Sequence, residues 1–143
     1  MSSKEIVNNR ERLLVLAACL LITFCMGTVH AFSTLIQNIE MQTNVGRMAS
    51  SLVYSTALIN VTLAVYVGHI LYRKFSPQVL IFFIAILPII GLLISNSESW
   101  IGWIIGYGIF FGFSSGLGYG LSLYIVSSVT ENEKLGFALG LVT

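Results

Sequence analysis

The chain has 143 residues, of which 56% are hydrophobic and 9% are charged, and its formal net charge at pH 7 is +1. Soluble domains carry about 25% charged residues, so this composition excludes an ordinary water-soluble domain. The near-neutral charge also excludes binding to nucleic acid through a basic face.

Long apolar runs without formal charge set the fold class. They cover residues 13–36, 48–71, 79–97 and 101–128. A helix needs about 20 residues to cross a bilayer core, and each run has about that length or more. We therefore predict an all-α, multi-pass integral membrane protein with four transmembrane helices and an incomplete fifth at 135–143. The domain division is a cytoplasmic tail, 1–12, followed by an N-terminal transmembrane bundle, 13–143.

The first run carries a polar stripe on an otherwise apolar helix. Thr23, His30 and Thr34 recur at α-helical spacing and therefore lie on one face. His30 is the only ionisable residue of this stripe. It either hydrogen-bonds a neighbouring helix or binds substrate or a proton, a role that suits histidine near neutral pH. Cys19 and Cys25, also in this run, are interpreted as small hydrophobic residues rather than as a disulfide or a metal site.

Polar residues on three of the helices indicate a water-filled cavity between them. In the second run Ser55 and Asn60 lie on neighbouring faces, and in the fourth Ser115 shares a face with Tyr119. The third run has polar residues only at its end, which favours a position facing lipid, with Ile84 as a lipid-exposed side chain. The predicted solute path is lined by Thr23, His30, Thr34, Ser55, Asn60, Ser115 and Tyr119.

Glycines spaced by four residues mark the fourth run. In lipid, helices associate through close packing, and small residues let their backbones approach. The stripe predicts a packing groove, with Gly112 and Gly116 closest to the second or the first helix, as a static contact or as one that slides during function. Gly-Tyr-Gly at 106–108 and 118–120 lies inside an uninterrupted span, unlike a potassium filter. The stripe consists of Gly108, Gly112, Gly116 and Gly120.

No arrangement of residues indicates catalysis. The sequence has no nucleophile paired with a base, no spacing of metal ligands and no phosphate-binding loop after a strand. We therefore expect neither an enzyme nor a bound cofactor or metal.

The link between the second and third runs reads GHILYRKFSP, residues 68–77. It resembles the Gly-x-x-x-Asp-Arg-x-Gly-Arg pattern of the major facilitator superfamily, with Gly68 and Arg73 in place and Tyr72 where the acid would stand. The resemblance implies a cytoplasmic gate loop that contains Gly68, Arg73 and Lys74.

Two further stretches narrow the resemblance. EKLGFALGLVT, at 133–143, is similar to the entry into helix five of the oxalate/formate-antiporter and monocarboxylate-transporter branch, with Gly136, Ala138 and Gly140 in place. MGTVHAFSTL, at 26–35, is similar to helix one of that branch, with His30 in its tyrosine position.

The resemblance implies a secondary transporter of twelve helices in two halves that rock around a central site. The chain would supply part of the N-terminal half, and its first, second and fourth helices would line the path. The implied cargo is a small organic anion, such as a monocarboxylate or a dicarboxylate, or a similar solute, moved by alternating access. The implied partners are the lipid bilayer, the solute, a proton, and the remaining C-terminal helices or another chain. Two alternatives are a four-span scaffold or assembly subunit without transport and an ion channel.

The basic residues predict how the chain lies in the membrane. Because successive spans cross the membrane in opposite directions, the tail and every second link lie on the same side. Six of the seven Lys and Arg lie in these segments, and only Arg47 lies on the other side. Cytoplasmic segments are enriched in Lys and Arg, so the N-terminus is expected in the cytoplasm. The six are Lys4, Arg10, Arg12, Arg73, Lys74 and Lys134.

Cysteine labelling in intact cells tests this orientation. Cysteines placed at Ser3 and Arg73 should be protected from a membrane-impermeant maleimide, and a cysteine at Glu40 should react with it. Labelling of position 73 from outside would show that the orientation is reversed.

Overall fold

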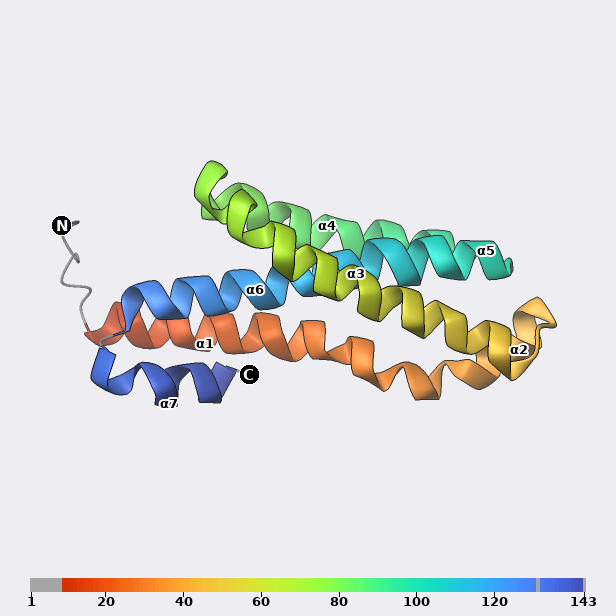
Figure 1. The fold of residues 1–143 in the computed structure, drawn as a ribbon, viewed down its shortest axis with the longest axis horizontal. Coiled ribbons are helices and arrows are strands. Elements are labelled where there is room, and N and C mark those ends of the chain that lie inside the picture. The colour runs from red at the N-terminus through yellow and green to blue at the C-terminus, as the bar shows by residue number, and fades with distance from the viewer. Residues whose placement is uncertain (1–8, 131, 143) are drawn as a thin grey trace.

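The computed structural model describes residues 9–130 and 132–142, which fold into helices joined by short turns (Figure 1). These ranges contain no β-strand and include four helices that are long and apolar enough to cross a membrane. The predicted fold class is thereby confirmed. The first part of the expected tail, with Lys4, and the side chain of Lys134 lie outside this description.

The first half of the chain forms two of the spans. α1 (Asn9–Met26) continues into a 3₁₀ segment, η1 (Gly27–Thr34), and the short helix α2 (Ile36–Thr43) follows. α2 ends at Asn44, which adopts the left-handed conformation with φ 54° and ψ 34°. Asparagine tolerates this conformation better than most residues, so it can reverse the chain here. The second span, α3 (Arg47–Lys74), then runs back along the first.

The second half of the chain forms the other two spans. α4 (Pro77–Ser95) begins with a proline, whose fixed φ and missing N–H suit the first turn of a helix. The fourth span is a continuous helix that changes its type along its length. It comprises α5 (Trp100–Trp103), a π-helical segment η2 (Ile104–Phe111) and α6 (Gly112–Val129). α7 (Asn132–Val142) follows and lies beside α1 and α6.

The fourth span is the centre of the bundle. Of its 18 most apolar consecutive residues, 61% are buried inside the bundle. The corresponding share is 11% for the first span and 22% for each of the other two. The reason is that α1, α3 and α4 all pack against it. The first three spans therefore have much of their surface exposed outside the bundle.

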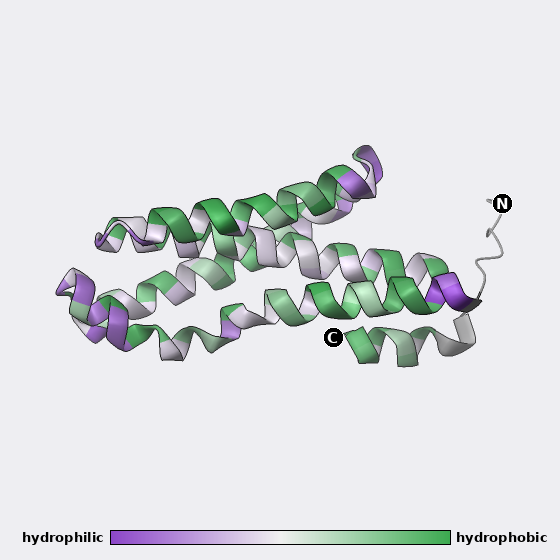
Figure 2. Cartoon of the chain, turned by 180° about the vertical axis from the view of Figure 1, so that it is seen from behind, coloured by the Kyte–Doolittle hydropathy of each residue, from purple (hydrophilic) through white to green (hydrophobic). Residues whose placement is uncertain are grey.

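The two ends of the bundle are hydrophilic and the middle is apolar (Figure 2). The start of α1, with Arg10, lies at the same end as the last turn of α3, with Arg73 and Lys74. Arg47 lies at the opposite end, beside α2. The described basic residues are thus divided between the two ends in the way that the predicted orientation assumes.

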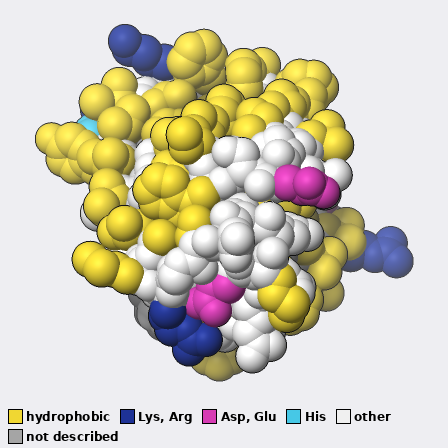
Figure 3. Space-filling model, turned by 90° about the vertical axis from the view of Figure 1, so that its right-hand side faces the viewer, with side chains coloured by type: hydrophobic (Ala, Val, Ile, Leu, Met, Phe, Trp, Pro, Cys, Tyr) yellow, Lys and Arg dark blue, Asp and Glu magenta, His cyan; other side chains and the backbone are white. Residues whose placement is uncertain are grey.

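At the end of the bundle that carries Arg47, hydrogen bonds join the termini of neighbouring helices. Glu40 Oε1 accepts bonds from Arg47 Nε and Ser50 Oγ, both at 3.1 Å, and the bond from Arg47 is the main cause that lowers the pKa of Glu40. Trp100 Nε1 donates to the carbonyl oxygen of Ala49 at 2.8 Å and ties the fourth span to α3. Figure 3 looks onto this end and shows acidic side chains in a surface that is mostly hydrophobic or uncharged.

The structure places the glycine stripe of the fourth span against α3. A Cβ atom built on Gly112 would lie 2.7 Å from the carbonyl oxygen of Ala57, and one built on Gly116 would meet the backbone of Val61. Contacts this short leave no room for a methyl group, because backbone atoms cannot rotate away. The other two glycines of the stripe also face α3: Gly108 and Gly120.

α4 has a buried face as well as a lipid-facing one. The prediction that Ile84 faces lipid is wrong, because its side chain is 5% exposed and its carbonyl oxygen accepts a hydrogen bond from Ser114 Oγ at 2.9 Å. α4 is apolar on all sides, so hydrophobicity alone cannot distinguish its inner face. The contact face is marked instead by Gly91, which packs on the fourth span, whereas Phe82 and Leu93 point outward.

Alanine substitutions test the glycine contact. Gly112→Ala and Gly116→Ala should each lower the free energy of unfolding by about 1–3 kcal/mol, the usual cost of overpacking a protein core. Gly140→Ala is the matched control, because no described atom beyond the adjacent backbone of its own helix lies within 4 Å of its Cβ position. It should be neutral or stabilising, since alanine favours a helix over glycine by about 1 kcal/mol. Unfolding in mixed detergent micelles compares the variants, and equal stability of all three would refute the contact.

Candidate functional site

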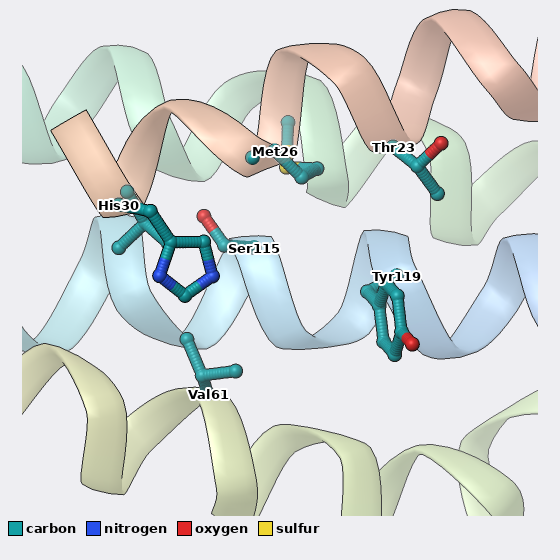
Figure 4. Close-up of a pocket in the computed structure, with 8 residues that line it drawn as sticks. Thr23, Met26, His30, Val61, Ser115 and Tyr119 are labelled. Carbon is teal, nitrogen blue, oxygen red and sulfur yellow. The ribbon is translucent and has the colours of Figure 1, made fainter. Parts of the chain in front are cut away.

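One cavity lies between the first, second and fourth spans (Figure 4). Its volume is about 280 Å³. In the close-up, His30 and Ser115 stand at one end, and Thr23 and Tyr119 stand toward the other. The lining residues are Thr23, Met26, Gly27, Val29, His30, Val61, Ser115 and Tyr119.

Four of the seven residues predicted for the solute path meet in this cavity. Thr23 and His30 come from the first span, and Ser115 and Tyr119 come from α6. Ser115 and Tyr119 are one helical turn apart, so both reach the same cavity wall. The fourth span is the most buried of the four, so its packing against the other spans holds these two side chains in place.

The other three predicted residues do not line the cavity. Each donates a hydrogen bond to a carbonyl oxygen of its own helical segment: Thr34 at 2.8 Å, Ser55 at 3.2 Å and Asn60 at 2.9 Å. A polar group satisfied in this way needs neither water nor a partner helix. A polar stripe in the sequence is therefore weaker evidence for a wet surface than its composition suggests.

The 3₁₀ segment η1 explains why Thr34 turns away from the cavity. The sequence prediction assumed α-helical spacing, in which residues four apart differ by about 40° around the axis. A 3₁₀ helix has three residues per turn, so residues four apart differ by about 120° and residues three apart coincide. Gly27 and His30 therefore share one edge, which faces the cavity, and Thr34 does not.

A tyrosine bridge holds η1 against the π-helical segment η2. Tyr107 Oη donates to the carbonyl oxygen of Val29 at 3.2 Å, and the Tyr107 ring lies 5.1 Å from the ring of Phe32. The Tyr107 ring also stacks on Phe111 at 4.9 Å within η2. Both irregular segments thus meet in one buried aromatic cluster beside the cavity.

His30 lies within hydrogen-bond distance of a residue on α3. Its Nδ1 is 3.2 Å from Tyr54 Oη, and Tyr54 stacks on Phe32 with ring centroids 5.4 Å apart. If the tyrosine hydroxyl donates, the neutral ring carries its proton on Nε2. The structural and the substrate-binding interpretations of His30 are both compatible with this geometry.

The hydroxyl groups of the cavity divide into acceptors and a donor. Thr23 donates to carbonyl oxygens of α1 at 3.1 Å, and Ser115 donates to the carbonyl oxygen of Phe111 at 2.9 Å. A hydroxyl has one proton, so toward the cavity these two groups can only accept. Tyr119 has no hydrogen-bond partner among the described residues and can donate its proton to a ligand.

The predicted gate loop is built differently from the pattern that it resembles. Tyr72, in the position of the acid, is buried, and its hydroxyl donates to the carbonyl oxygen of Leu117 at 2.9 Å. Gly68 gives room to the Tyr72 ring, because a Cβ there would lie 2.7 Å from a ring carbon. Arg73 and Lys74 are exposed at the end of α3. Among these residues the structure assigns a packing role to Gly68 and leaves both cations free to contact other groups.

Four lining residues are not among the predicted path residues: Met26, Gly27, Val29 and Val61. Met26, Val29 and Val61 are apolar and sit in apolar runs, so no chemical signal distinguishes them from neighbours that face lipid. Their only sequence signal is spacing, since Met26 lies three residues after Thr23 in α1.

Comparisons with known proteins give one match. A sequence model of the Major Facilitator Superfamily matches residues 2–143. No curated protein and no solved structure shows a significant match to the chain. Within the described residues, no group of three or more His, Cys, Asp and Glu could hold a metal ion.

Cysteine substitution tests whether the cavity is filled with water. In a background without Cys19 and Cys25, Thr23→Cys and Tyr119→Cys should react with a small water-soluble thiol reagent. Ser122→Cys, on the same helix but 1% exposed and outside the cavity, should stay unlabelled. The rates of labelling in detergent or in liposomes compare them. Similar rates at positions 119 and 122 would contradict an open polar cavity.

Proposed function

Because the chain belongs to the major facilitator superfamily, a family of secondary transporters, we propose that its cavity is part of a path for a small organic anion. The cargo would be a monocarboxylate, a dicarboxylate or a similar solute. The observation that carries the proposal is the meeting of Thr23, His30, Ser115 and Tyr119 around one cavity.

The lining of the cavity supports an anionic cargo. None of the lining residues is acidic, so a carboxylate would meet no like charge there. Tyr119 offers an O–H donor, and His30 offers a ring N–H when its Nδ1 accepts from Tyr54. The volume of about 280 Å³ lies just below the usual range for small-molecule sites, which favours a compact solute.

His30 supports coupling of the cargo to a proton. Protonation would give the cavity a positive charge, which an anionic solute would neutralise, so each would favour binding of the other. The same reasoning predicts little coupling for an uncharged solute. His30 is the only histidine among the lining residues, and histidine is the residue type that most often carries protons in proteins.

The packing of the spans supports movement as a rigid unit. Alternating access is largely the rocking of one bundle against another around a fixed site. The glycine contact between α3 and the fourth span holds the two inner walls of the cavity together. We propose that the open side of the cavity faces a second bundle, from this chain's own protein or from a partner chain, and that the basic end faces the cytoplasm.

Uptake measurements test the proposal. Cells that express the protein from its native coding sequence should accumulate radiolabelled lactate, pyruvate, oxalate or formate in a saturable manner. Tyr119→Phe removes the free donor and should raise KM about tenfold or more, because a charge-assisted hydrogen bond contributes about 1.5–3 kcal/mol. His30→Gln should reduce the dependence of uptake on an inward proton gradient.

The control is Phe82→Leu, on the outer face of α4, which should leave uptake unchanged at equal surface expression. Absence of saturable uptake for all four anions would contradict the anion proposal and favour a scaffold without transport activity. Ion currents without saturation would favour a channel.

A further inference from the structure

A second cavity lies outside the proposed path, at the basic end of the bundle. It is a groove of about 350 Å³ between the last turn of α3, the first half of α4 and the start of α6. Its lining is apolar throughout and includes Leu71, Phe75, Leu80, Phe83 and Leu87. α3 and α4 both pack on the fourth span, which contributes Phe113 and Leu117 to the groove, while the lining residues Phe75 and Phe83 are about half exposed.

Two cations stand in the last turn of α3, next to lining residues of this groove. Arg73 and Lys74 stand in the sequence between the lining residues Leu71 and Phe75, and both are exposed. Lys74 follows Leu71 by three residues, so the two lie on the same side of α3. Neither cation forms an ion pair with a described residue.

No carboxylate whose side chain the structure describes pairs with these cations; Glu5, Glu131 and Glu133 lie outside the described residues and side chains. The sequence contains no Asp, and no Glu lies between Glu40 and Glu98, so α3 and α4 carry no acidic residue. Glu40 and Glu98 lie at the opposite end of the bundle. Glu11 lies in α1, which packs on α6 and α7 instead of lining the groove.

The dimensions of the groove suit a lipid chain. Leu80 and Leu87 are seven residues apart in α4, so they span about 10 Å along the helix, the length of about eight methylene groups. Apolar packing alone does not select one lipid, because any acyl chain offers the same surface. Selectivity must therefore come from the charges next to the groove.

We propose that this groove binds an anionic phospholipid. One acyl chain lies along Leu80, Phe83 and Leu87, and the phosphate contacts Arg73 and Lys74. The proposal goes beyond the proposed transport function and does not depend on the cargo. It agrees with the predicted orientation, since anionic lipids are concentrated in the cytoplasmic leaflet.

Native mass spectrometry of the purified protein in detergent micelles tests the proposal. The protein is titrated with phosphatidylglycerol and with phosphatidylcholine that carry the same acyl chains. Phosphatidylglycerol should bind about 25-fold more tightly, because each of the two basic residues contributes about fivefold, and the double variant Arg73→Gln/Lys74→Gln should lose this preference. Arg10→Gln, an exposed cation at the same end but in α1, should keep the preference.

A second pair of variants separates the groove from the charges. Leu87→Trp fills the groove and should weaken binding of both lipids, whereas Leu93→Trp, on the outer face of α4 where Leu93 is 70% exposed, should not. Equal affinity for the two lipids in the unmodified protein would overturn the proposal. So would a preference that survives in the double variant, or a dimer that binds no lipid, which would show that a second copy covers the groove.

Discussion

The close approach of two helix backbones, at Gly112 and Gly116 of the fourth span, determines the position of most other elements. In a bilayer no hydrophobic force draws helices together, so contact at van der Waals distance must supply the stabilisation. The opposite side of the same span approaches α4 equally closely, where a Cβ built on Gly91 would lie 2.5 Å from the carbonyl oxygen of Gly106. The fourth span is therefore held from both sides. Ser115 is the immediate neighbour of Gly116, so the contact that packs the helices also fixes the polar wall of the cavity.

The sequence predicts the transmembrane helices, because the lipid around them restricts which structures are possible. Lipid requires every backbone polar group to be satisfied within a helix, so long apolar runs leave few alternative structures, and the number of spans follows from composition. The glycine stripe could be read for the same reason, since small residues at four-residue spacing have a definite use in lipid. Ile84 shows where this reasoning fails. When a whole helix is apolar, the residue types do not distinguish the face that packs on protein from the face that contacts lipid.

The cavity was predictable only in part, because its geometry depends on departures from the α-helix. The sequence places Thr23 and His30 on one face because their spacing still fits an α-helix up to the junction of α1 and η1. Thr34 was misplaced because η1 changes the helical period after Gly27. Ser55 and Asn60 were misplaced for a different reason, since bonds to their own helix satisfy them without a cavity. Val61 and Met26 form apolar parts of the wall, and only the tertiary arrangement identifies them.

The 3₁₀ segment η1 also has a consequence for how the first span fits the hydrocarbon thickness of the bilayer. A 3₁₀ helix rises about 2.0 Å per residue and an α-helix about 1.5 Å, so the eight residues of η1 reach about 4 Å further than they would as α-helix. Bilayers of different organelles differ in thickness by a similar few ångströms. The 3₁₀ winding of η1 thus adds to the hydrophobic length of the span without adding residues, while the contacts of α1 with α6 and α7 anchor the other end. The first span therefore owes part of its reach across the bilayer to the winding of one short segment beside the cavity.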